Sequence, residues 1–255
     1  PQPHQPQFSL HYQPIIEIAT SRLYGAEALL RWNHPQKGLI PPDSFIPIAE
    51  DSGLIIDIGK WVAREAISTA ANWNRQQPAR KFHIAINMST QQFDQSHDCL
   101  GLLHKLLSDT GLDPSLLELE ITESLLMENS PHLIETLQAV KSLGAGLSID
   151  DFGTGYSSLS YIRQYPISTI KIDRSFIHDI HLDSGNASLI AAIIAMADSL
   201  GLDVVAEGVE TKQQLTFLQE HGCRFAQGYY FSHPLPQQEF EQKFLSELSR
   251  ITDFA

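Results

Sequence analysis

Seven apolar, strand-like segments of this chain each end in a polar residue, and most of these residues are acidic. In a β/α barrel the carboxyl ends of the strands meet at one rim, so contributions scattered through the sequence converge in space. Carboxylate and amide oxygens at such density favour a hard divalent cation. The strand-end residues are Glu27, Asn87, Glu120, the pair Asp150 and Asp151, Lys171, Glu207 and Gln227.

The Asp150-Asp151 pair is the strongest single indication of a cation site. Two adjacent carboxylates at a barrel mouth repel each other unless a cation lies between them. Such a pair can also be a helix cap with a salt bridge, but the other oxygen donors at equivalent strand ends favour the metal. Asn87 alone is typical of a turn or cap. Ser89 is the better cap for the segment that follows, which leaves the Asn87 carbonyl oxygen for the cation.

Lys171 lies between two isoleucines inside an apolar segment. A lysine that points into a barrel is costly unless opposite charge meets it. One alternative is a structural ion pair with Asp173; the other is a cation that holds the attacking water or a phosphate. The 11 histidines show no H-E-x-x-H spacing, and His178 and His181 are expected on the surface or in loops. Magnesium or manganese is therefore favoured over zinc.

The composition narrows the classes of function and compartment. With 17 basic and 30 acidic side chains the formal charge is 17 − 30 = −13, which argues against polymeric nucleic acid and anionic lipid as partners. Cys99 and Cys223 form no disulfide framework, so a reducing, cytoplasmic setting is expected. The most apolar helical segment, 189–200, contains Asp198 and is expected to pack on the barrel rather than cross a membrane.

The order of elements predicts the fold. Two strands, 8–17 and 23–32, are joined by a turn short enough for an antiparallel hairpin. Two helices, about 42–51 and 53–75, come next. Strands and helices then alternate, and glycines are expected to end several of the helices. The expected strands are 83–88, 117–121, 146–149, 169–172, 204–206 and 224–231, and the expected helical segments are 98–110, 131–143, 158–163, 187–200, 211–221 and 236–248.

Eight strands alternating with about eight helices predict an α/β fold with a parallel sheet. At 255 residues this favours a (β/α)8 TIM-type barrel whose first strand is antiparallel. Residues 1–7, which are polar and rich in proline, are expected to be a linker remnant, and residues 8–250 the barrel domain.

The motifs resemble one known family along about residues 8–245. Glu27-Ala28-Leu29 is the tripeptide of the EAL domains, which are phosphodiesterases of bacterial cyclic di-GMP signalling. Further matching segments are Tyr12-Gln13-Pro14-Ile15, Asn87-Met88-Ser89, Glu120-Ile121-Thr122-Glu123, Asp150-Asp151-Phe152-Gly153-Thr154-Gly155-Tyr156, Lys171-Ile172-Asp173, Glu207-Gly208-Val209-Glu210 and Gln227-Gly228-Tyr229.

The resemblance implies a role for each matching position. It implies two ions, Mg²⁺ or Mn²⁺, and catalytic roles for Glu27, Asp151, Lys171 and Glu207, with Lys171 touching the nucleophilic water. The implied ligands of the first ion are Glu27, Asn87, Glu120 and Asp150, and those of the second are Asp150, Asp151 and Glu207. The implied substrate contacts are Gln13, Pro14, Leu30, Arg31, Asp173, Glu210 and Gln227. The implied loop that couples the site to a dimer interface is Phe152, Gly153, Thr154, Gly155, Tyr156, Ser157 and Ser158.

The function implied is hydrolysis of cyclic di-GMP to linear pGpG, with two ions activating water. This would lower a second messenger that governs bacterial behaviour such as biofilm formation. The alternatives are a cyclic di-GMP receptor that does not cleave it, and an enolase-like lyase, which the lack of a lid domain disfavours. The resemblance further implies a homodimer without direct membrane contact by this domain. A regulatory domain before residue 1 is compatible with it, as is a place in the cytosolic part of a larger membrane protein.

Overall fold

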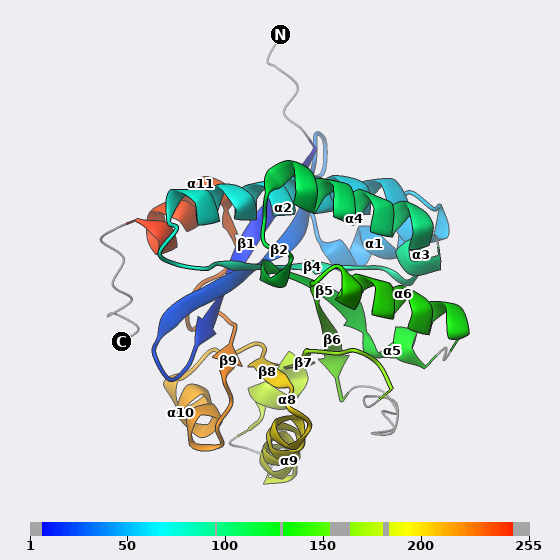
Figure 1. Cartoon of the computed structure of the whole chain (residues 1–255). Coiled ribbons are helices and arrows are strands. Elements are labelled where there is room, and N and C mark those ends of the chain that lie inside the picture. The colour runs from blue at the N-terminus through cyan, green and yellow to red at the C-terminus, as the bar shows by residue number, and fades with distance from the viewer. Residues whose placement is uncertain (1–6, 95, 128–129, 154–163, 181–183, 247–255) are drawn as a thin grey trace.

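The computed structural model describes residues 7–94, 96–127, 130–153, 164–180 and 184–246. Its strands form one sheet (Figure 1). In chain order the strands are β1 (Phe8–Glu17), β2 (Arg22–His34), β3 (Gly38–Ile40), β4 (His83–Asn87), β5 (Leu117–Thr122), β6 (Gly146–Phe152), β7 (Thr169–Ile172), β8 (Asp203–Ala206), β9 (Phe225–Ala226) and β10 (Leu235–Pro236).

Eight of these strands close into a barrel. The sheet order is β10-β1-β9-β8-β7-β6-β5-β4-β2-β3, and β1 also pairs with β2, which completes the ring. Strands β2 and β4 to β9 run parallel, while β1 is antiparallel to both of its barrel neighbours. The predicted (β/α)8 barrel with one antiparallel strand is therefore confirmed; β3 and β10 are short additions at the two ends of the sheet.

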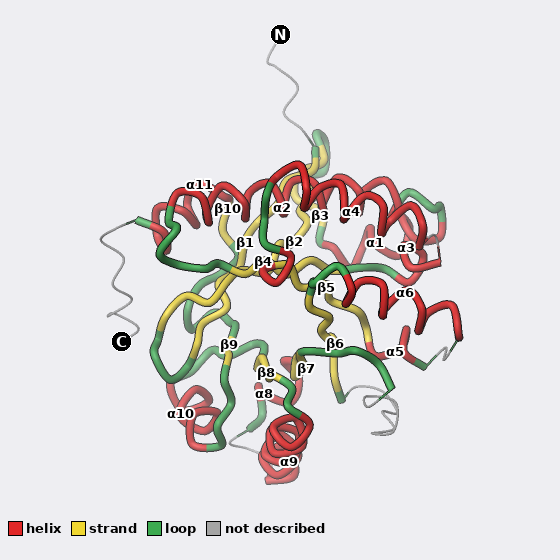
Figure 2. Tube along the Cα trace, in the orientation of Figure 1, coloured by secondary structure: helices red, strands yellow, loops and turns green. Residues whose placement is uncertain are grey.

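Helices cover the outside of the barrel, and the strands ring its centre (Figure 2). The helices and helical turns are α1 (Pro42–Asp51), α2 (Ile55–Gln76), α3 (Thr90–Asp94), α4 (Ser96–Thr110), η1 (Pro114–Leu116), α5 (Glu123–Leu126), α6 (Pro131–Ser142), α8 (Arg174–His178), α9 (Ser184–Leu200), α10 (Lys212–Glu220), α11 (Gln237–Phe240) and the π-helical turn η2 (Glu241–Leu245). Among the described residues, none of these helices combines the length and apolar character needed to cross a bilayer.

Helix α2 shows why the outer layer forms. Its apolar side chains recur every three to four residues, so Val62, Ala66, Ile67 and Ala70 are buried on one face against the barrel. Each strand in turn sends alternate side chains outward to such helices and inward to the barrel centre. On β5, for example, Leu117, Leu119 and Ile121 join the outer core. The residues between them on β5 consequently face the barrel interior.

Two predicted elements at the C-terminal end of the domain are wrong in extent. The predicted strand 224–231 is reduced to β9, because the backbone after it hydrogen bonds to Val209 and to itself: Val209 N–H donates to the Gln227 carbonyl, and Tyr230 N–H to the Val209 carbonyl. A Cβ on Gly228 would lie 2.1 Å from the Val209 oxygen, so only glycine permits this approach. The predicted helix 236–248 is α11 followed by η2, and residues beyond 246 lie outside the described part.

Other boundaries agree with the prediction within a few residues. Gly144 and Gly201 follow α6 and α9 with φ of 92° and 70°, the left-handed conformation of a glycine helix end. Gln7, predicted as linker, already hydrogen bonds to β2: its carbonyl accepts from Asn33 N–H at 2.7 Å, and its side chain accepts from Trp32 Nε1 at 3.2 Å. Residues 1–6 and the predicted helical segment 158–163 lie outside the described residues.

Candidate active site

The carboxyl ends of the parallel strands gather the strand-end residues at one rim, as the sequence predicts. Strand pairing places Glu27 on β2 opposite Gln13 on β1, and Asn87 at the end of β4 opposite Glu120 on β5. Asp150 stands near the end of β6 beside Thr122. The residues that complete the set are Lys171 on β7, Glu207 directly after β8 and Gln227 directly after β9.

Lys171 is the centre of this cluster. Its side chain is 1 % exposed, and its Nζ lies 2.7 Å from Glu207 Oε1 and 2.8 Å from Glu120 Oε2. Asp150 Oδ1 is 3.1 Å away and Glu27 Oε2 3.5 Å away. Four strands therefore contribute carboxylates around one ammonium, and removal of either side of this arrangement would leave buried charge without a partner.

The predicted alternative of a Lys171–Asp173 ion pair does not describe this arrangement. Asp173 follows β7 and caps α8: its Oδ1 accepts from the Ser175 backbone N–H at 3.0 Å. Asp173 is two residues after Lys171 in the sequence. However, β7 ends at Ile172, and Asp173 is already the N-cap of α8. The charge that Lys171 meets comes from β2, β5, β6 and the end of β8, which only the tertiary structure brings together.

Two amides hold Glu27. Asn87 Nδ2 donates to Glu27 Oε1 at 2.7 Å, and Gln227 Nε2 donates to Glu27 Oε2 at 2.6 Å. Gln227 Nε2 also donates to Gln13 Oε1 at 2.9 Å, and Gln13 Nε2 donates to the Ser232 carbonyl at 3.2 Å. Because the Asn87 nitrogen is committed to Glu27, its carbonyl oxygen is the atom left to face a cation.

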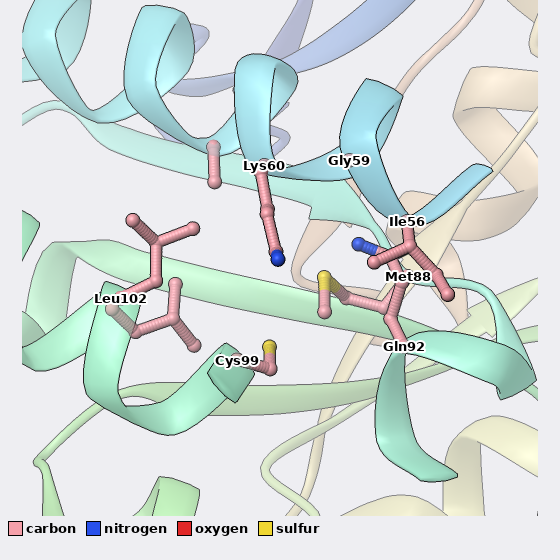
Figure 3. A pocket seen from close by; sticks show the side chains of 9 residues that line it. Ile56, Gly59, Lys60, Met88, Gln92, Cys99 and Leu102 are labelled. Carbon is pink, nitrogen blue, oxygen red and sulfur yellow. The ribbon is translucent and has the colours of Figure 1, made fainter. Parts of the chain in front are cut away.

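The turn that carries Asn87 is supported from outside the barrel. The Ser89 hydroxyl has no hydrogen-bond partner among the described residues, so the predicted Ser89 cap is not formed by that side chain. Instead Gln92 on α3 accepts from Ser89 backbone N–H at 2.9 Å. Met88, Gln92 and Cys99 line a small apolar cavity of about 20 Å³ between α2, α3 and α4 (Figure 3). This packing fixes the position of Asn87.

The acids of the cluster differ in their tendency to ionise. Burial opposes ionisation of Glu27, but Lys171 and the two amide donors outweigh it and lower the pKa of Glu27. Burial, together with the charge of Glu27, raises the pKa of Glu120 well above its usual value. Burial also raises the pKa of Glu207 to about 8; Lys171 opposes this shift and Asp150 adds to it. One ammonium is therefore too little positive charge for this set of carboxylates.

Lys171 itself stays charged. Burial opposes its charge, but Glu120, Glu207 and Glu27 outweigh burial and raise the pKa of Lys171 well above its usual value. The cluster thus contains a permanent cation and still carries excess negative charge. Additional positive charge at this rim would stabilise the ionised form of every acid in it.

The donor set fits divalent ions. One ligand oxygen each from Asp150, Asp151 and Glu207 can lie within 4.8 Å of the others, close enough to share an ion. Glu120 Oε2 and Asp150 Oδ1 are buried and near Lys171 Nζ, yet neither accepts a well-directed hydrogen bond among the described residues. Asp151 has φ of 54°, a strained conformation typical of functional sites. Hard oxygen donors of this kind favour a hard divalent cation.

Three of the predicted substrate contacts lie at the rim. Gln13 and Gln227 are buried beside Glu27. Arg31 is four residues after Glu27 on β2, so its side chain lies on the same face of the strand, nearer the rim. Arg31 is half-buried, and its Nη1 donates to the Leu30 carbonyl at 2.8 Å. Burial lowers the pKa of Arg31, which remains a cation at neutral pH.

The other predicted contacts are placed differently. Pro14 and Leu30 alternate with Gln13 and Arg31, so their side chains point away from the barrel interior, and Leu30 belongs to the outer core. Asp173 caps α8, as described. Glu210 is exposed, and its backbone N–H donates to Gln214 Oε1 at 2.8 Å at the start of α10. The structure therefore does not bring Pro14 and Leu30 side chains to the acidic cluster.

One residue at the site was not predicted. Glu123, the first residue of α5, is 6 % exposed, and its Oε2 accepts from Gly153 N–H at 3.0 Å. Gly153 also lies against Phe176, where a Cβ would approach the ring to 2.9 Å. Glu123 thereby ties the end of β6, and the segment after the Asp pair, to β5. A second glutamate three residues after Glu120 was the available signal. Of the predicted coupling loop, Phe152 and Gly153 are described and residues 154–158 lie outside the described part.

Comparison with known proteins places this site in a family. The family model named EAL domain matches residues 2–234. The chain belongs to the EAL domain family. Among relatives, this EAL domain is 45 % identical to the signaling protein YkoW of Bacillus subtilis over 96 % of its length, and 44 % identical to the cyclic di-GMP phosphodiesterase NbdA of Pseudomonas aeruginosa over 92 %. It covers 30 % of each, so it spans about a third of the length of the curated relatives it matches.

Solved structures of the same family superpose closely on this EAL domain. It matches the PaMucR phosphodiesterase in complex with c-di-GMP with a TM-score of 0.87 and 43 % identity, covering 92 % of this chain and 94 % of that one. The EAL domain of FimX from Pseudomonas aeruginosa bound to c-di-GMP matches with a TM-score of 0.81 and 25 % identity, covering 91 % of each chain. The barrel and the place of its rim are thus common to the family.

Proposed function

We propose that this EAL domain is a metal-dependent phosphodiesterase that hydrolyses cyclic di-GMP to linear pGpG. The observation that supports it most is the buried Lys171 ammonium among four carboxylates, with Asp151 at the edge of the same cluster. The relatives NbdA and PdeR, whose names state this activity, are 44 % and 39 % identical to the domain. Every position that the family resemblance implies for metal binding carries an oxygen donor here.

The resemblance to the EAL family supplies the ligand roles in this proposal. Glu27, Asn87, Glu120 and Asp150 would hold one ion, and Asp150, Asp151 and Glu207 a second, with Asp150 between the two. Such a pair of ions would supply charge to activate water and to neutralise the phosphodiester. Neighbouring side chains orient the carboxylates: Gln227 and Asn87 hold Glu27 by hydrogen bonds, and Lys171 holds Glu120 and Glu207 by ion pairs.

The proposed reaction breaks one phosphodiester bond. Water attacks phosphorus in line, the bond to the ribose 3′ oxygen breaks, and that oxygen leaves with a proton. Lys171 lies where its N–H donors can hold the attacking water or a phosphate oxygen. Arg31, on the same face of β2 as Glu27, offers a second cation to a dianionic substrate at the otherwise acidic rim. Lys171 and Arg31 thus attract the negative phosphates, which the acidic side chains of the rim would otherwise repel.

The deciding experiment is incubation of the purified domain with cyclic di-GMP and either Mg²⁺ or Mn²⁺, with the product separated by chromatography. We expect pGpG to accumulate, to stop when EDTA is added, and to resume when either ion is restored in excess. Cyclic di-GMP binding without any product, across both ions and a range of pH, would instead identify the domain as a receptor. Product that keeps forming after exhaustive chelation would contradict the metal requirement.

The remaining expectations about cellular context are part of this proposal. They are a homodimer coupled to the site through residues 152–158, a regulatory domain elsewhere in a longer protein, and a cytoplasmic or cytosol-facing location. The domain covers only 30 % of YkoW and of NbdA, which supports the expectation of a regulatory domain in a longer protein. Analytical ultracentrifugation with and without substrate tests the first.

A further inference from the structure

A second small cavity lies inside the barrel beneath the acidic cluster. Its volume is about 20 Å³, which is room for a single water molecule. One side is apolar and the other is polar. The apolar side includes Ile15, Ala85, Val205 and Phe225, and the polar side includes Glu118, Glu120, Ser148, Thr169 and Lys171; Tyr24 and His83 complete the lining.

Strand pairing explains why the polar residues face one another. Ser148 on β6 is the direct partner of Glu120 on β5 and of Thr169 on β7. Ser148 is also two residues before Asp150, so its side chain points to the same interior face one layer deeper. The cavity therefore separates the carboxylate layer above from the apolar layer below.

The Ser148 hydroxyl is one of two polar groups of this cavity whose hydrogen bonding is incomplete among the described residues. Ser148 is 1 % exposed, and its Oγ has no hydrogen-bond partner among the described residues. Its polar neighbours are better satisfied: Glu118 Oε1 accepts from Ser168 Oγ at 3.1 Å, and Glu118 also hydrogen bonds with Thr169. A buried hydroxyl without a partner is rare in native proteins and is usually met by internal water.

Glu120 supplies the second polar partner. Its Oε2 is buried and 2.8 Å from Lys171 Nζ, but it accepts no well-directed hydrogen bond among the described residues. A water between Ser148 Oγ and the Glu120 carboxylate would have a donor and an acceptor at once. Lys171 lines the same cavity, and its ammonium pairs with Glu120 above it. Two to four polar partners are what an internal water requires.

We propose that this cavity binds one ordered water, held by Ser148 and Glu120, and that Ser148 is a positioning residue for the metal-facing carboxylate of Glu120. The water occupies the lower side of the carboxylate and prevents its rotation, so that the upper oxygen stays directed at the rim. The water site does not depend on the proposed function. The positioning role of Ser148 rests on that function.

The test compares Ser148→Ala with wild type and with Ser142→Ala. Ser142 ends α6, where its exposed hydroxyl donates to the Gln138 carbonyl, so it is a matched serine outside the barrel. Crystal structures at better than about 1.5 Å should show the water within hydrogen-bond distance of Ser148 Oγ in wild type and in Ser142→Ala, and not in Ser148→Ala. Calorimetric titration with Mn²⁺ should show affinity about 10-fold weaker in Ser148→Ala alone, the usual scale for residues that orient a metal ligand.

The outcomes separate the two proposals. A dry cavity in wild type, or a Ser148 hydroxyl bonded to a protein acceptor, would overturn the water site whether or not the domain cleaves cyclic di-GMP. A water that is present while Ser148→Ala binds Mn²⁺ and turns over substrate like wild type would overturn the positioning role. If wild type fails to hydrolyse cyclic di-GMP but the water is seen and Mn²⁺ binding weakens as expected, the proposed function fails and the water site stands.

Discussion

At the scale of single residues, the decisive feature is one buried ammonium that meets four carboxylates, two of them buried and two partly exposed. A buried charge is stable only beside an opposite charge, so Lys171 and the carboxylates around it stabilise one another in their ionised forms. The same mutual dependence makes the cluster sensitive to any added cation. Burial raises the pKa of Glu120 and of Glu207, so these are the acids whose ionised form a divalent ion would stabilise most.

Removal of Lys171 tests its part in turnover. We expect Lys171→Ala, Glu27→Ala and Asp151→Asn each to lower kcat for cyclic di-GMP hydrolysis by at least ~100-fold, the scale for loss of a major electrostatic contribution. Lys212→Ala, at the exposed start of α10, is the control and should leave kcat unchanged. Circular dichroism must show that each variant is folded. A folded variant with near-full activity would remove that residue from the mechanism.

His83 gives a pH dependence that is separate from catalysis. It begins β4 at the lower end of the barrel and stacks on Tyr24 with ring centroids 4.0 Å apart. Burial, and then the charge of Lys81, lowers the pKa of His83 to about 4. The unfolded chain has the ordinary value near 6.5, so between these values the unfolded state binds the extra proton. The stability linked to His83 is complete above the higher value and is lost as the pH falls toward the lower one.

His83→Phe, which keeps the stacking ring, isolates this contribution. Urea unfolding at pH 7 and pH 5 should show wild type losing on the order of 2 kcal/mol more than the variant over this interval. The same pH-linked loss in both proteins would show that His83 is protonated as readily in the fold as in the unfolded chain.

At the scale of elements, the site depends on how one outer helix meets the turn after β4. Gly59 lies inside α2 directly against the Gln92 amide, where a Cβ would come within 1.9 Å of Nε2 (Figure 3). Gln92 in turn accepts from the Ser89 backbone, two residues after Asn87. The absence of a side chain at Gly59 is therefore what allows α3 to fix the Asn87 turn.

A double-mutant cycle tests this contact. Gly59→Ala should lower the free energy of unfolding by about 1–2 kcal/mol, because the displaced amide leaves Ser89 N–H without its acceptor. In a Gln92→Ala background the same substitution should raise stability by about 1 kcal/mol, because alanine is the better helix former. Chemical denaturation of the four proteins gives both values. An equal effect in both backgrounds would show that Gly59 and Gln92 are not coupled.

At the scale of the whole molecule, the barrel brings together residues that lie 200 positions apart, such as Glu27 and Gln227. Excess negative charge at the rim opposes this assembly, so ions that bind there should stabilise the fold. The ring closes through β1, which pairs with β9 at only two positions, Ile16 with Ala226 and Glu17 with Phe225. The side-chain bonds from Gln227 to Gln13 and Glu27 lie directly above this seam and strengthen it.

Thermal and chemical unfolding with Mn²⁺ test the link between ions and fold. At 100 times its dissociation constant, Mn²⁺ should raise the free energy of unfolding by about 2.7 kcal/mol per site, and EDTA should reverse the gain. Asp150→Asn, at the carboxylate shared by both proposed ions, should largely abolish it. Asp198→Asn, an exposed carboxylate on α9, should respond to Mn²⁺ like wild type. Equal stabilisation of both variants would show that Mn²⁺ binds elsewhere.

The sequence alone determined the barrel, the antiparallel start and the set of strand-end residues. Each follows from local information: a short turn forces a hairpin, alternating elements force a parallel sheet, and parallel strands carry their end residues to one rim. The orientation of the Pro14 and Leu30 side chains, away from the barrel interior, also follows from the two-residue period of a strand.

Tertiary structure decided which partners those residues meet. Lys171 could pair with Asp173 by sequence, but the barrel brings it to four other acids, from β2, β5, β6 and the end of β8, while Asp173 turns away to cap α8. The predicted last strand stops at Ala226 because Val209 offers its backbone groups to the segment beyond, a contact between chain positions that no local pattern contains. Hydrogen bonds and ion pairs between distant segments depend on register and distance, and only the folded chain fixes both.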